Sequence, residues 1–259
     1  MREMKNLREK IRSRTPVVGT FAALPHPMAV EIVARGGFDC LCIDWEHTQL
    51  GRERLEDMLR AADCRATPAI VRLPGHDPEA ISAALDAGAA GILAPHVSTV
   101  EEALAIARAA RFPPHGTRGA GPGRAAGYGY GVFDYVARAN EEIVVAVQIE
   151  TAQGLENIAA IAALDEIDLL FIGPGDLALS IGALGDGGAE RLDAAMETII
   201  DHCGNAGRAV GLFRPSADDL PRWVSRGASF FLISSDAMLM GAAATATADA
   251  AARALGRRK

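Results

Sequence analysis

Lysine and cysteine are both scarce in this chain, and their scarcity excludes two kinds of chemistry. The lysines stand only in the tails, as Lys5, Lys10 and Lys259. An enzyme that forms a Schiff base needs a lysine in its interior, so covalent catalysis of that kind is excluded. Four cysteines occur, none of them in a CxxC pair: Cys40, Cys42, Cys64 and Cys203. We therefore expect free thiols, as in cytoplasmic proteins, and neither a disulfide framework nor a thiolate metal site.

The chain also lacks a net positive charge and long hydrophobic runs. The 259 residues carry a formal net charge of −7 with a pI near 5.4, which does not suit binding to a phosphate backbone. The charged N-terminal segment 1–14 has no apolar stretch behind it and does not resemble a signal peptide. A spanning helix needs roughly 18 apolar residues, whereas Ala237–Leu255 is interrupted by Asp249 and Arg253. We expect a soluble cytoplasmic protein that binds neither nucleic acid nor membrane.

Short apolar runs alternate with segments of helical spacing along most of the chain. The predicted strands are 17–23, 38–43, 68–73, 91–95, 144–149, 168–172, 209–213 and 229–234. The predicted helices are 3–14, 27–35, 52–65, 78–87, 99–111, 133–140, 155–164, 189–205, 216–226 and 237–255. Alternation of this kind over about 250 residues predicts one (β/α)₈ TIM barrel spanning 1–259, with an extra N-terminal helix. A doubly wound open sheet is the alternative, but no GxGxxG follows the first strand.

Two segments do not follow the alternation. Residues 112–131 contain seven glycines and three prolines and have no apolar period. A loop of this length in a compact domain is typical of a functional or interface element. It lacks the lysine and hydroxyl of a P-loop, so it does not predict a phosphate site. Residues 177–187, rich in glycine and leucine, are also predicted to be loop.

The strongest chemical signal is a pair of carboxylates on two consecutive parallel strands. Glu150 follows the strand 144–149, and Asp176 follows the strand 168–172. Because a strand, a helix and a strand form a βαβ unit, both side chains emerge at the same edge of the sheet. Two oxygen ligands on rigid strand ends suit a hard divalent cation. Helix capping is the alternative, since both residues precede helices.

Other reactive side chains follow the remaining strands, where a barrel carries its active site. Asp44 is predicted to orient His47 as a general acid/base. Arg72 lies in an apolar run and needs an anion, either a substrate or a structural partner. The backbone from Gly173 to Leu177 is predicted to cradle a carboxylate, with Gly175, Asp176 and Leu177 binding the substrate. Two further candidates have weaker support, since each also suits simple packing: His96 after the fourth strand and Trp45 as a pocket wall.

Several blocks together resemble a known family. They are FDCLCIDWEHTQL, PAIVRL, GILAPHV, FPPHGTRG, VQIETAQGLENI and FIGPGDLA. In this order they resemble the HpcH/HpaI aldolase family of metal-dependent, class II pyruvate aldolases, such as 4-hydroxy-2-oxoheptanedioate aldolase and 2-keto-3-deoxy-sugar-acid aldolases. The resemblance covers roughly residues 15–240 and implies a barrel of the phosphoenolpyruvate/pyruvate-domain type.

The resemblance also implies roles for individual residues. Glu150 and Asp176 would hold Mg²⁺, Mn²⁺ or Co²⁺, and Arg72 would stabilise the enolate oxygen of pyruvate. Gln148 matches a glutamine that supports the metal site, and Asp86 matches an aspartate that reaches a neighbouring subunit's site. The family assembles as a homohexamer of swapped dimers, which implies that residues 237–259 pack on a neighbour. The chain departs from the family at Gly175, Trp45, the short region 182–188 and FFLISSDAM, so the aldehyde is not fixed by the resemblance.

Metal-assisted enolisation agrees with the missing lysine, and it predicts cleavage of a 4-hydroxy-2-oxo acid to pyruvate and an aldehyde. Two other functions are retained as alternatives. One is a citrate-lyase-like carbon–carbon lyase acting on a CoA thioester, although no additional basic segment suits a nucleotide diphosphate. The other is a metal-binding barrel without turnover.

Overall fold

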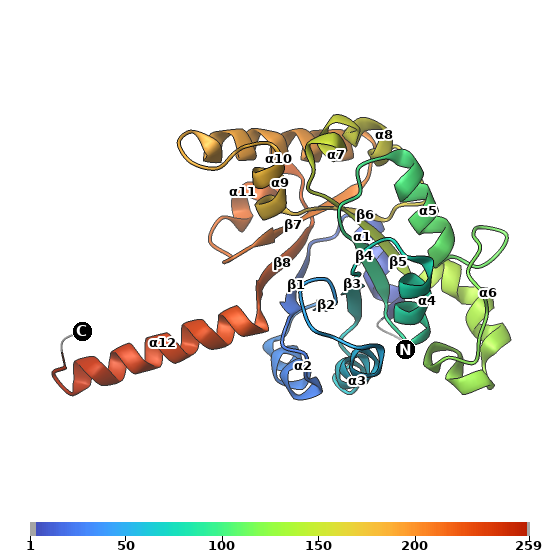
Figure 1. The fold of residues 1–259 in the computed structure, drawn as a ribbon, viewed down its shortest axis with the longest axis horizontal. Helices are drawn as coiled ribbons and strands as arrows, with labels where there is room; N and C mark the ends of the chain where they lie inside the picture. The colour runs from blue at the N-terminus through green and yellow to red at the C-terminus, as the bar shows by residue number, and fades with distance from the viewer. Residues whose placement is uncertain (1–3, 258–259) are drawn as a thin grey trace.

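The computed structural model describes residues 4–257, and it confirms the predicted (β/α)₈ barrel with an additional N-terminal helix (Figure 1). Eight parallel strands pair in sequence order and close when the last strand pairs with the first. The strands are β1 Val17–Ala22, β2 Cys40–Asp44, β3 Ala69–Arg72, β4 Gly91–Ala94, β5 Val144–Ile149, β6 Leu169–Ile172, β7 Ala209–Arg214 and β8 Phe230–Ser235. Because all strands run the same way, their carboxyl ends meet at a single rim, which we call the carboxyl rim; the opposite end is the amino rim.

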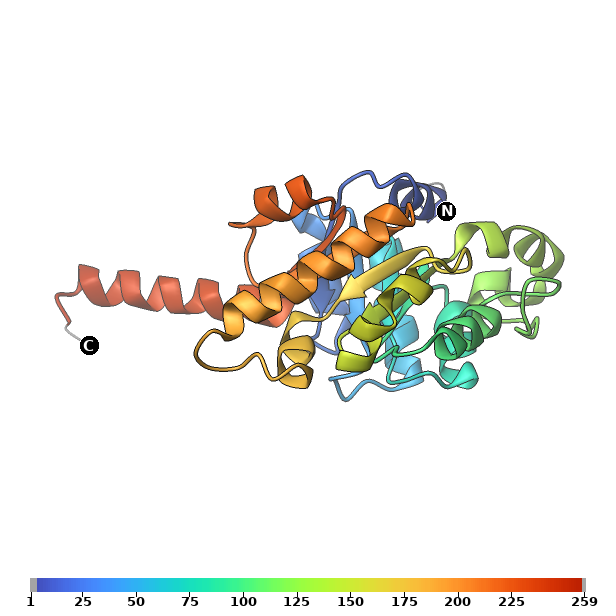
Figure 2. The same cartoon turned by 90° about the horizontal axis from the view of Figure 1, so that it is seen from above.

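Helices follow the strands and cover the outside of the barrel (Figures 1 and 2). They are α1 Met4–Arg12, α2 Pro27–Val33, α3 Arg52–Asp63, α4 Pro78–Asp86, α5 Val100–Ala110, α6 Val132–Glu142, α7 Ala152–Glu156, α8 Ile158–Ala162, α9 Pro174–Ser180, α10 Gly188–Asn205, α11 Leu220–Arg226 and α12 Asp236–Ala254, with short 3₁₀ helices η1 Ala34–Gly36 and η2 Arg124–Gly129. The apolar faces of most of these helices pack with the outward-facing strand residues into the larger of the two main cores; α1, α6 and α12 do not.

The barrel interior forms a separate core of inward-facing strand residues. Cys40 and Cys42 lie in it, fully buried, as free thiols that pack as small core residues. Burial raises the pKa of both thiols, which keeps them protonated. Gly19 opposes Cys40, and a Cβ there would come within 2.8 Å of the Cys40 carbonyl oxygen. The interior is therefore packed rather than hollow.

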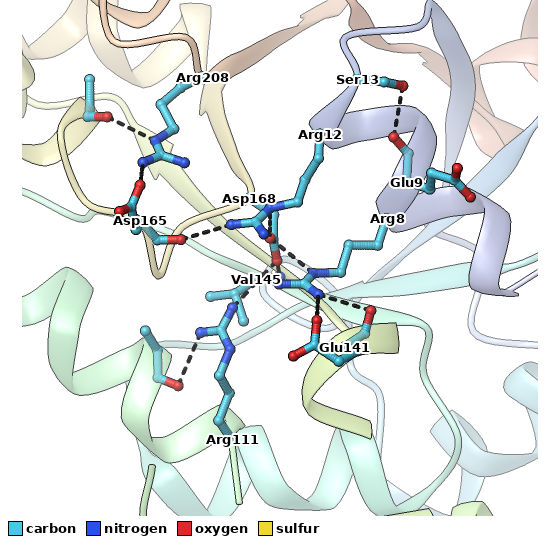
Figure 3. Close-up of polar contacts among 12 residues, drawn as sticks. Arg8, Glu9, Arg12, Ser13, Arg111, Glu141, Val145, Asp165, Asp168 and Arg208 are labelled. Atoms are coloured by element: carbon cyan, nitrogen blue, oxygen red, sulfur yellow. Dashed lines mark hydrogen bonds and ion pairs between the residues drawn. The ribbon is translucent and has the colours of Figure 1, made fainter. Parts of the chain in front are cut away.

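Helix α1 closes the amino rim, where a buried carboxylate is held by arginines (Figure 3). Leu7 and Ile11 of α1 join the interior core. Next to them, the side chain of Asp168 is fully buried at the start of β6. Its oxygens lie 3.0 Å from Arg8 Nε, 3.0 Å from Arg12 Nε and 3.5 Å from Arg111 Nη2, and they accept the Val145 backbone N–H at 2.9 Å. This carboxylate has no oxygen left for chemistry, so its role is to join α1 to the barrel.

Two predicted boundaries were wrong for local reasons. The predicted helix 155–164 is two short helices, α7 and α8, that meet at Asn157, whose φ of −91° and ψ of 4° are not helical. The predicted loop 177–187 contains the end of α9, because Pro174 fixes a helical φ in the first turn and the apolar residues after Asp176 continue it. The glycine-rich segment 112–131 is irregular, as predicted, apart from η2.

Helix α12 projects away from the barrel (Figures 1 and 2). Met238, Leu239 and Met240 are 46%, 42% and 60% exposed, and nearly all of the helix beyond them is exposed too. Asp236 alone is buried at its start, where it accepts the backbone N–H groups of Ala23 and Leu24. Within residues 4–257, no helix is both long and apolar enough to cross a membrane.

Candidate active site

Asp44 and Arg72 form an ion pair at the carboxyl ends of β2 and β3. They are register partners in the sheet, and both side chains point into the mouth of the barrel. Arg72 donates from Nε to Asp44 Oδ1 at 3.0 Å and from Nη2 to Oδ2 at 2.8 Å, a bidentate contact. Burial works against the charge of Arg72, but the carboxylates of Asp44 and Glu46 outweigh it and raise the pKa of Arg72. The guanidinium is therefore fixed and permanently charged.

The turn after β2 carries Glu46 and His47. Asp44 Oδ1 accepts their backbone N–H groups at 3.1 and 3.3 Å, so Asp44 holds the turn through the main chain. The side chain of His47 is 58% exposed, and its Nε2 lies 3.6 Å from Glu46 Oε2. The expected contact between Asp44 and the His47 ring is replaced by this contact with Glu46, because both Asp44 oxygens already serve Arg72 and the turn.

Glu150 is 1% exposed at the end of β5. Its Oε1 accepts the backbone N–H of His96 at 2.7 Å, and its Oε2 accepts the side-chain amide of Gln148. Burial raises the pKa of Glu150, against the lowering effect of these two hydrogen bonds. Gly173, after β6, lies against this carboxylate, and a Cβ at that position would overlap Glu150 and Gln148. The site thus requires glycine at 173.

His96 joins Glu150 to Glu46. Its Nδ1 lies 3.0 Å from Glu150 Oε1, and its Nε2 lies 3.1 Å from Glu46 Oε1. Donor atoms of these three residues all lie within 4.8 Å of one another, a spacing that suits one metal ion. Glu46 Oε2 also lies 3.3 Å from Arg72 Nε. The two carboxylates and the imidazole therefore form one connected network with the Asp44–Arg72 pair.

A cavity of about 290 Å³ opens beside this network. One part of its wall is polar, with Asp44, Arg72, Gln148 and Asp176, and another is apolar. The apolar part consists of Phe21, Ala23, Phe171, Phe213 and Met238. Gln148 Oε1 is buried and has no hydrogen-bond partner within residues 4–257. The cavity is thus a concave site with convergent polar groups and one unused acceptor.

Helix α9 brings Asp176 to this cavity in its first turn. Glu150 and Asp176 do lie at the same rim, as their parallel strands predict. The predicted backbone cradle is narrower than expected, because Leu177 is buried and its N–H donates to Gly173 O at 3.0 Å. Pro174 has no N–H, so the cradle consists of Gly175 and Asp176.

The sequence profile of the HpcH/HpaI aldolase/citrate lyase family matches residues 18–243. The chain belongs to this family. It is 34% identical over 232 residues to the 5-keto-4-deoxy-D-glucarate aldolase of Shigella boydii, covering 90% of each chain. Because it belongs to the HpcH/HpaI family, the chain is a carbon–carbon lyase, namely a class II aldolase.

Solved structures of the family share the whole fold. A HpcH/HpaI aldolase/citrate lyase family protein from Burkholderia cenocepacia superposes with a TM-score of 0.89 at 34% identity, covering 95% of this chain and 99% of that one. The citrate synthase SbnG superposes with a TM-score of 0.87 at 26% identity, covering 97% and 99%. Proteins that share this fold thus carry names of different carbon–carbon reactions.

The predicted HpcH/HpaI site residues that line the cavity are Asp44, Arg72, Gln148, Gly175 and Asp176, whereas His47, His96, Glu150 and Leu177 are not in its wall. Two further predicted residues, Trp45 and Asp86, have contacts elsewhere. Trp45 donates from its indole N–H to Leu50 O at 2.6 Å and packs on the outer core, so it stabilises the turn rather than forming a pocket wall. Asp86 lies at the end of α4, toward the amino rim, where Arg118 Nη2 contacts it at 2.6 Å. Asp86 therefore cannot serve the site of its own subunit.

Two residues shape the HpcH/HpaI site in ways that sequence reasoning did not predict: Glu46 contacts Arg72 and His96, and Gly173 leaves room for the Glu150 side chain. Glu46 lies two residues after Asp44, and that spacing places a side chain on the same side of an extended chain. Gly173 belongs to the GPGDL block, and a glycine directly after a buried strand indicates a close approach. Both signals were present in the sequence.

Proposed function

We propose that this aldolase cleaves 4-hydroxy-2-oxo acids to pyruvate and an aldehyde at the carboxyl rim. The observation that carries the proposal is an imbalance of charge. Asp44 and Asp176 line the cavity, Glu46 and Glu150 lie next to it, and Arg72 is the only arginine or lysine of residues 4–257 in its wall. Asp44 and Glu150 are buried and the other two are half-buried, and carboxylates in such excess need a cation.

Glu150 and Asp176 would hold that cation, which we propose to be Mg²⁺, Mn²⁺ or Co²⁺. The residues fit a hard ion, because Glu150 is fixed at both oxygens and Gln148 Oε1 is an orphaned acceptor beside it. When bound, the ion supplies a Lewis acid and a template for a 2-oxo acid. Gln148 would keep the Glu150 carboxylate oriented, as supporting residues of metal sites do.

Arg72 would donate to the oxygen that becomes negative as the carbon–carbon bond breaks. Asp44 engages its Nε and Nη2, so the plane of the guanidinium is set before substrate arrives. Cζ of Arg72 lies 4.5 Å from the centroid of the Phe21 ring, which shields the group from water. A preorganised donor of this kind is typically worth about 10²–10³ in rate. Asp44 acts as a positioning residue.

His47 would remove the proton of the 4-hydroxyl group during cleavage and return it in the direction of synthesis. Its exposed ring can exchange protons with solvent. Glu46, 3.6 Å from Nε2, holds the ring toward the network. Thus Arg72 and His47 act on different oxygens of the substrate, and their effects are separable.

The apolar part of the cavity would receive the aldehyde. Phe21 and Phe213 contact each other with centroids 5.9 Å apart, and Met238 lies in the same wall. Within residues 4–257, Arg72 is the only arginine or lysine in the wall that could bind an anionic group. We therefore propose that the released aldehyde is uncharged.

Helix α12 supports assembly, and we propose a homohexamer that acts in the cytoplasm. A helix with exposed Met238, Leu239 and Met240 that projects from the barrel has an apolar surface for a neighbouring subunit. Asp86, remote from its own cavity, would then serve a neighbour. Light scattering at micromolar concentration should give the mass of an oligomer, and a monomer would contradict this part.

A lyase acting on a CoA thioester is the second candidate, supported by the similarity to the citrate synthase SbnG. The lack of additional cations at the cavity speaks against a nucleotide diphosphate. The third candidate is a barrel that binds a metal ion but catalyses no reaction. The third does not explain why Arg72 and the carboxylates converge on one small cavity.

Pyruvate release from a panel of 4-hydroxy-2-oxo acids and CoA thioesters, assayed with lactate dehydrogenase, tests the proposal. Chelator-treated protein should be inactive and should recover with Mn²⁺, Mg²⁺ or Co²⁺. The Glu150→Ala/Asp176→Ala double variant should stay inactive with any of them. Full activity in excess chelator, or in the double variant, would refute the metal-dependent reaction.

A further inference from the structure

His96 has a left-handed backbone conformation. Its φ is 55°, in the left-handed region that residues other than glycine rarely occupy. Such strain persists only where surrounding contacts hold it, and it is concentrated at functional sites. Here the backbone N–H donates to Glu150 Oε1 at 2.7 Å. The strained backbone thus aims both the N–H and the ring of His96 at the same carboxylate.

The ring adds contacts on both sides. Nδ1 lies 3.0 Å from Glu150 Oε1, and Nε2 lies 3.1 Å from Glu46 Oε1. The side chain of Glu150 is fully buried and that of Glu46 is 9% exposed, so each carboxylate has little access to water that could replace the imidazole. Two buried carboxylates so close together repel each other unless a donor lies between them. His96 supplies that donor on a short loop after β4.

Gln148 and His96 hold opposite oxygens of Glu150. The amide of Gln148 donates to Oε2, while His96 contacts Oε1 through the main chain and the ring. Glu46, on the far side of the ring, lies 3.3 Å from Arg72 Nε. One imidazole thus connects the carboxylate proposed to bind the metal with the guanidinium proposed to meet the substrate.

We propose that His96 is a positioning residue that orients Glu150 for the divalent cation and fixes Glu46 against Arg72. The inference rests on the proposed function, since it gives Glu150 the role of ligand. Supporting residues of metal sites typically change metal affinity by about 10–100-fold when they are removed. His96→Ala should therefore weaken the binding of Mn²⁺ by about 10–100-fold.

Titration of the metal-free protein with Mn²⁺, followed by the electron paramagnetic resonance signal of the free ion, measures this affinity without turnover. Three variants separate the contacts of the ring. His96→Ala removes both, His96→Asn keeps an amide near the position of Nδ1, and His96→Gln keeps one near the position of Nε2. His96→Asn should bind Mn²⁺ nearly as well as the wild type, and its side chain also tolerates a left-handed backbone. His96→Gln should bind about as weakly as His96→Ala.

His202→Ala, on α10 and far from the site, is the matched control and should leave the affinity unchanged. Circular dichroism verifies that each variant is folded, and His96→Asn gives a result even where His96→Ala does not fold. Wild-type affinity in folded His96→Ala would overturn the proposal. So would a directly bound nitrogen in the electron spin echo modulation of the wild-type complex, because His96 would then be a ligand. Failure of the proposed function is distinguishable, because Glu150→Gln would then bind Mn²⁺ as tightly as the wild type.

Discussion

The two rims of the barrel both contain buried carboxylates, but they neutralise them in opposite ways. At the amino rim, Asp168 meets three arginines and a backbone N–H, so arginines outnumber carboxylates. At the carboxyl rim, Glu46 and Glu150 share the imidazole of His96, and Arg72 serves Asp44 and Glu46. The first arrangement is complete without a ligand and stabilises the fold. The second would be completed by the cation that we propose.

This comparison gives His47 a large expected effect on rate and nearly none on stability. His47→Ala should slow cleavage by about 10²–10⁴, the usual contribution of a general acid/base. Deuterium uptake into the methyl group of pyruvate, followed by NMR, should be less affected, because it does not involve the 4-hydroxyl. His202→Ala should change neither rate. Equal loss of exchange and cleavage would move His47 to the enolisation step.

Arg72 sharpens the comparison, because we propose it as a catalytic group and it is also half of an ion pair. Arg72→Ala should lower exchange and cleavage together, by about 10²–10³. It should also destabilise the fold, since Asp44 would be left buried without its partner. Arg72→Lys should not restore the rate, because the single ammonium group of lysine cannot replace the planar guanidinium with its several N–H donors. Exchange at the wild-type rate in Arg72→Ala would show that our role for this side chain is wrong.

The smallest expected effect concerns the apolar wall. Phe213→Ala removes part of the surface proposed for the aldehyde, so kcat/KM for adducts of apolar aldehydes should fall relative to those of small polar ones. Differences of this kind in an apolar pocket are worth about 10–200-fold. Phe133→Ala is the matched control, since Phe133 is 90% exposed on α6. A preference for anionic aldehydes in the wild type would contradict an uncharged product.

Much of this architecture could be predicted because its signals are local. Short β-branched runs and helical spacing predicted all eight strands, and parallel strands then placed Glu150, Asp176, Asp44 and Arg72 at one rim. Boundaries failed at Asn157 and after Pro174, where single residues set the backbone. Contacts that depend on the turns were not predictable, because no spacing in the sequence fixes where a side chain on a turn points.

His47, Trp45 and His96 illustrate this limit. Each lies on a turn, and its partner was decided by competition for a few oxygens. Asp44 forms an ion pair with Arg72, so the ring of His47 lies against Glu46 instead. The indole N–H of Trp45 donates to Leu50 O. His96 contacts two carboxylates because its backbone is left-handed, a conformation that the sequence did not predict. The resemblance to the family supplied roles, but not these contacts.

The central claim is that the amino rim serves stability and the carboxyl rim serves function, and one paired measurement tests it. The free energy of unfolding in urea and the Mn²⁺-dependent cleavage rate are measured for Asp168→Asn and Glu150→Gln. Asp168→Asn should lose about 3 kcal/mol of stability, because three arginines lose their carboxylate, while the folded protein keeps its rate. Glu150→Gln should lose the rate and no stability, because burial already disfavours the charge there. A Glu150→Gln protein as unstable as Asp168→Asn, yet fully active when folded, would contradict the account.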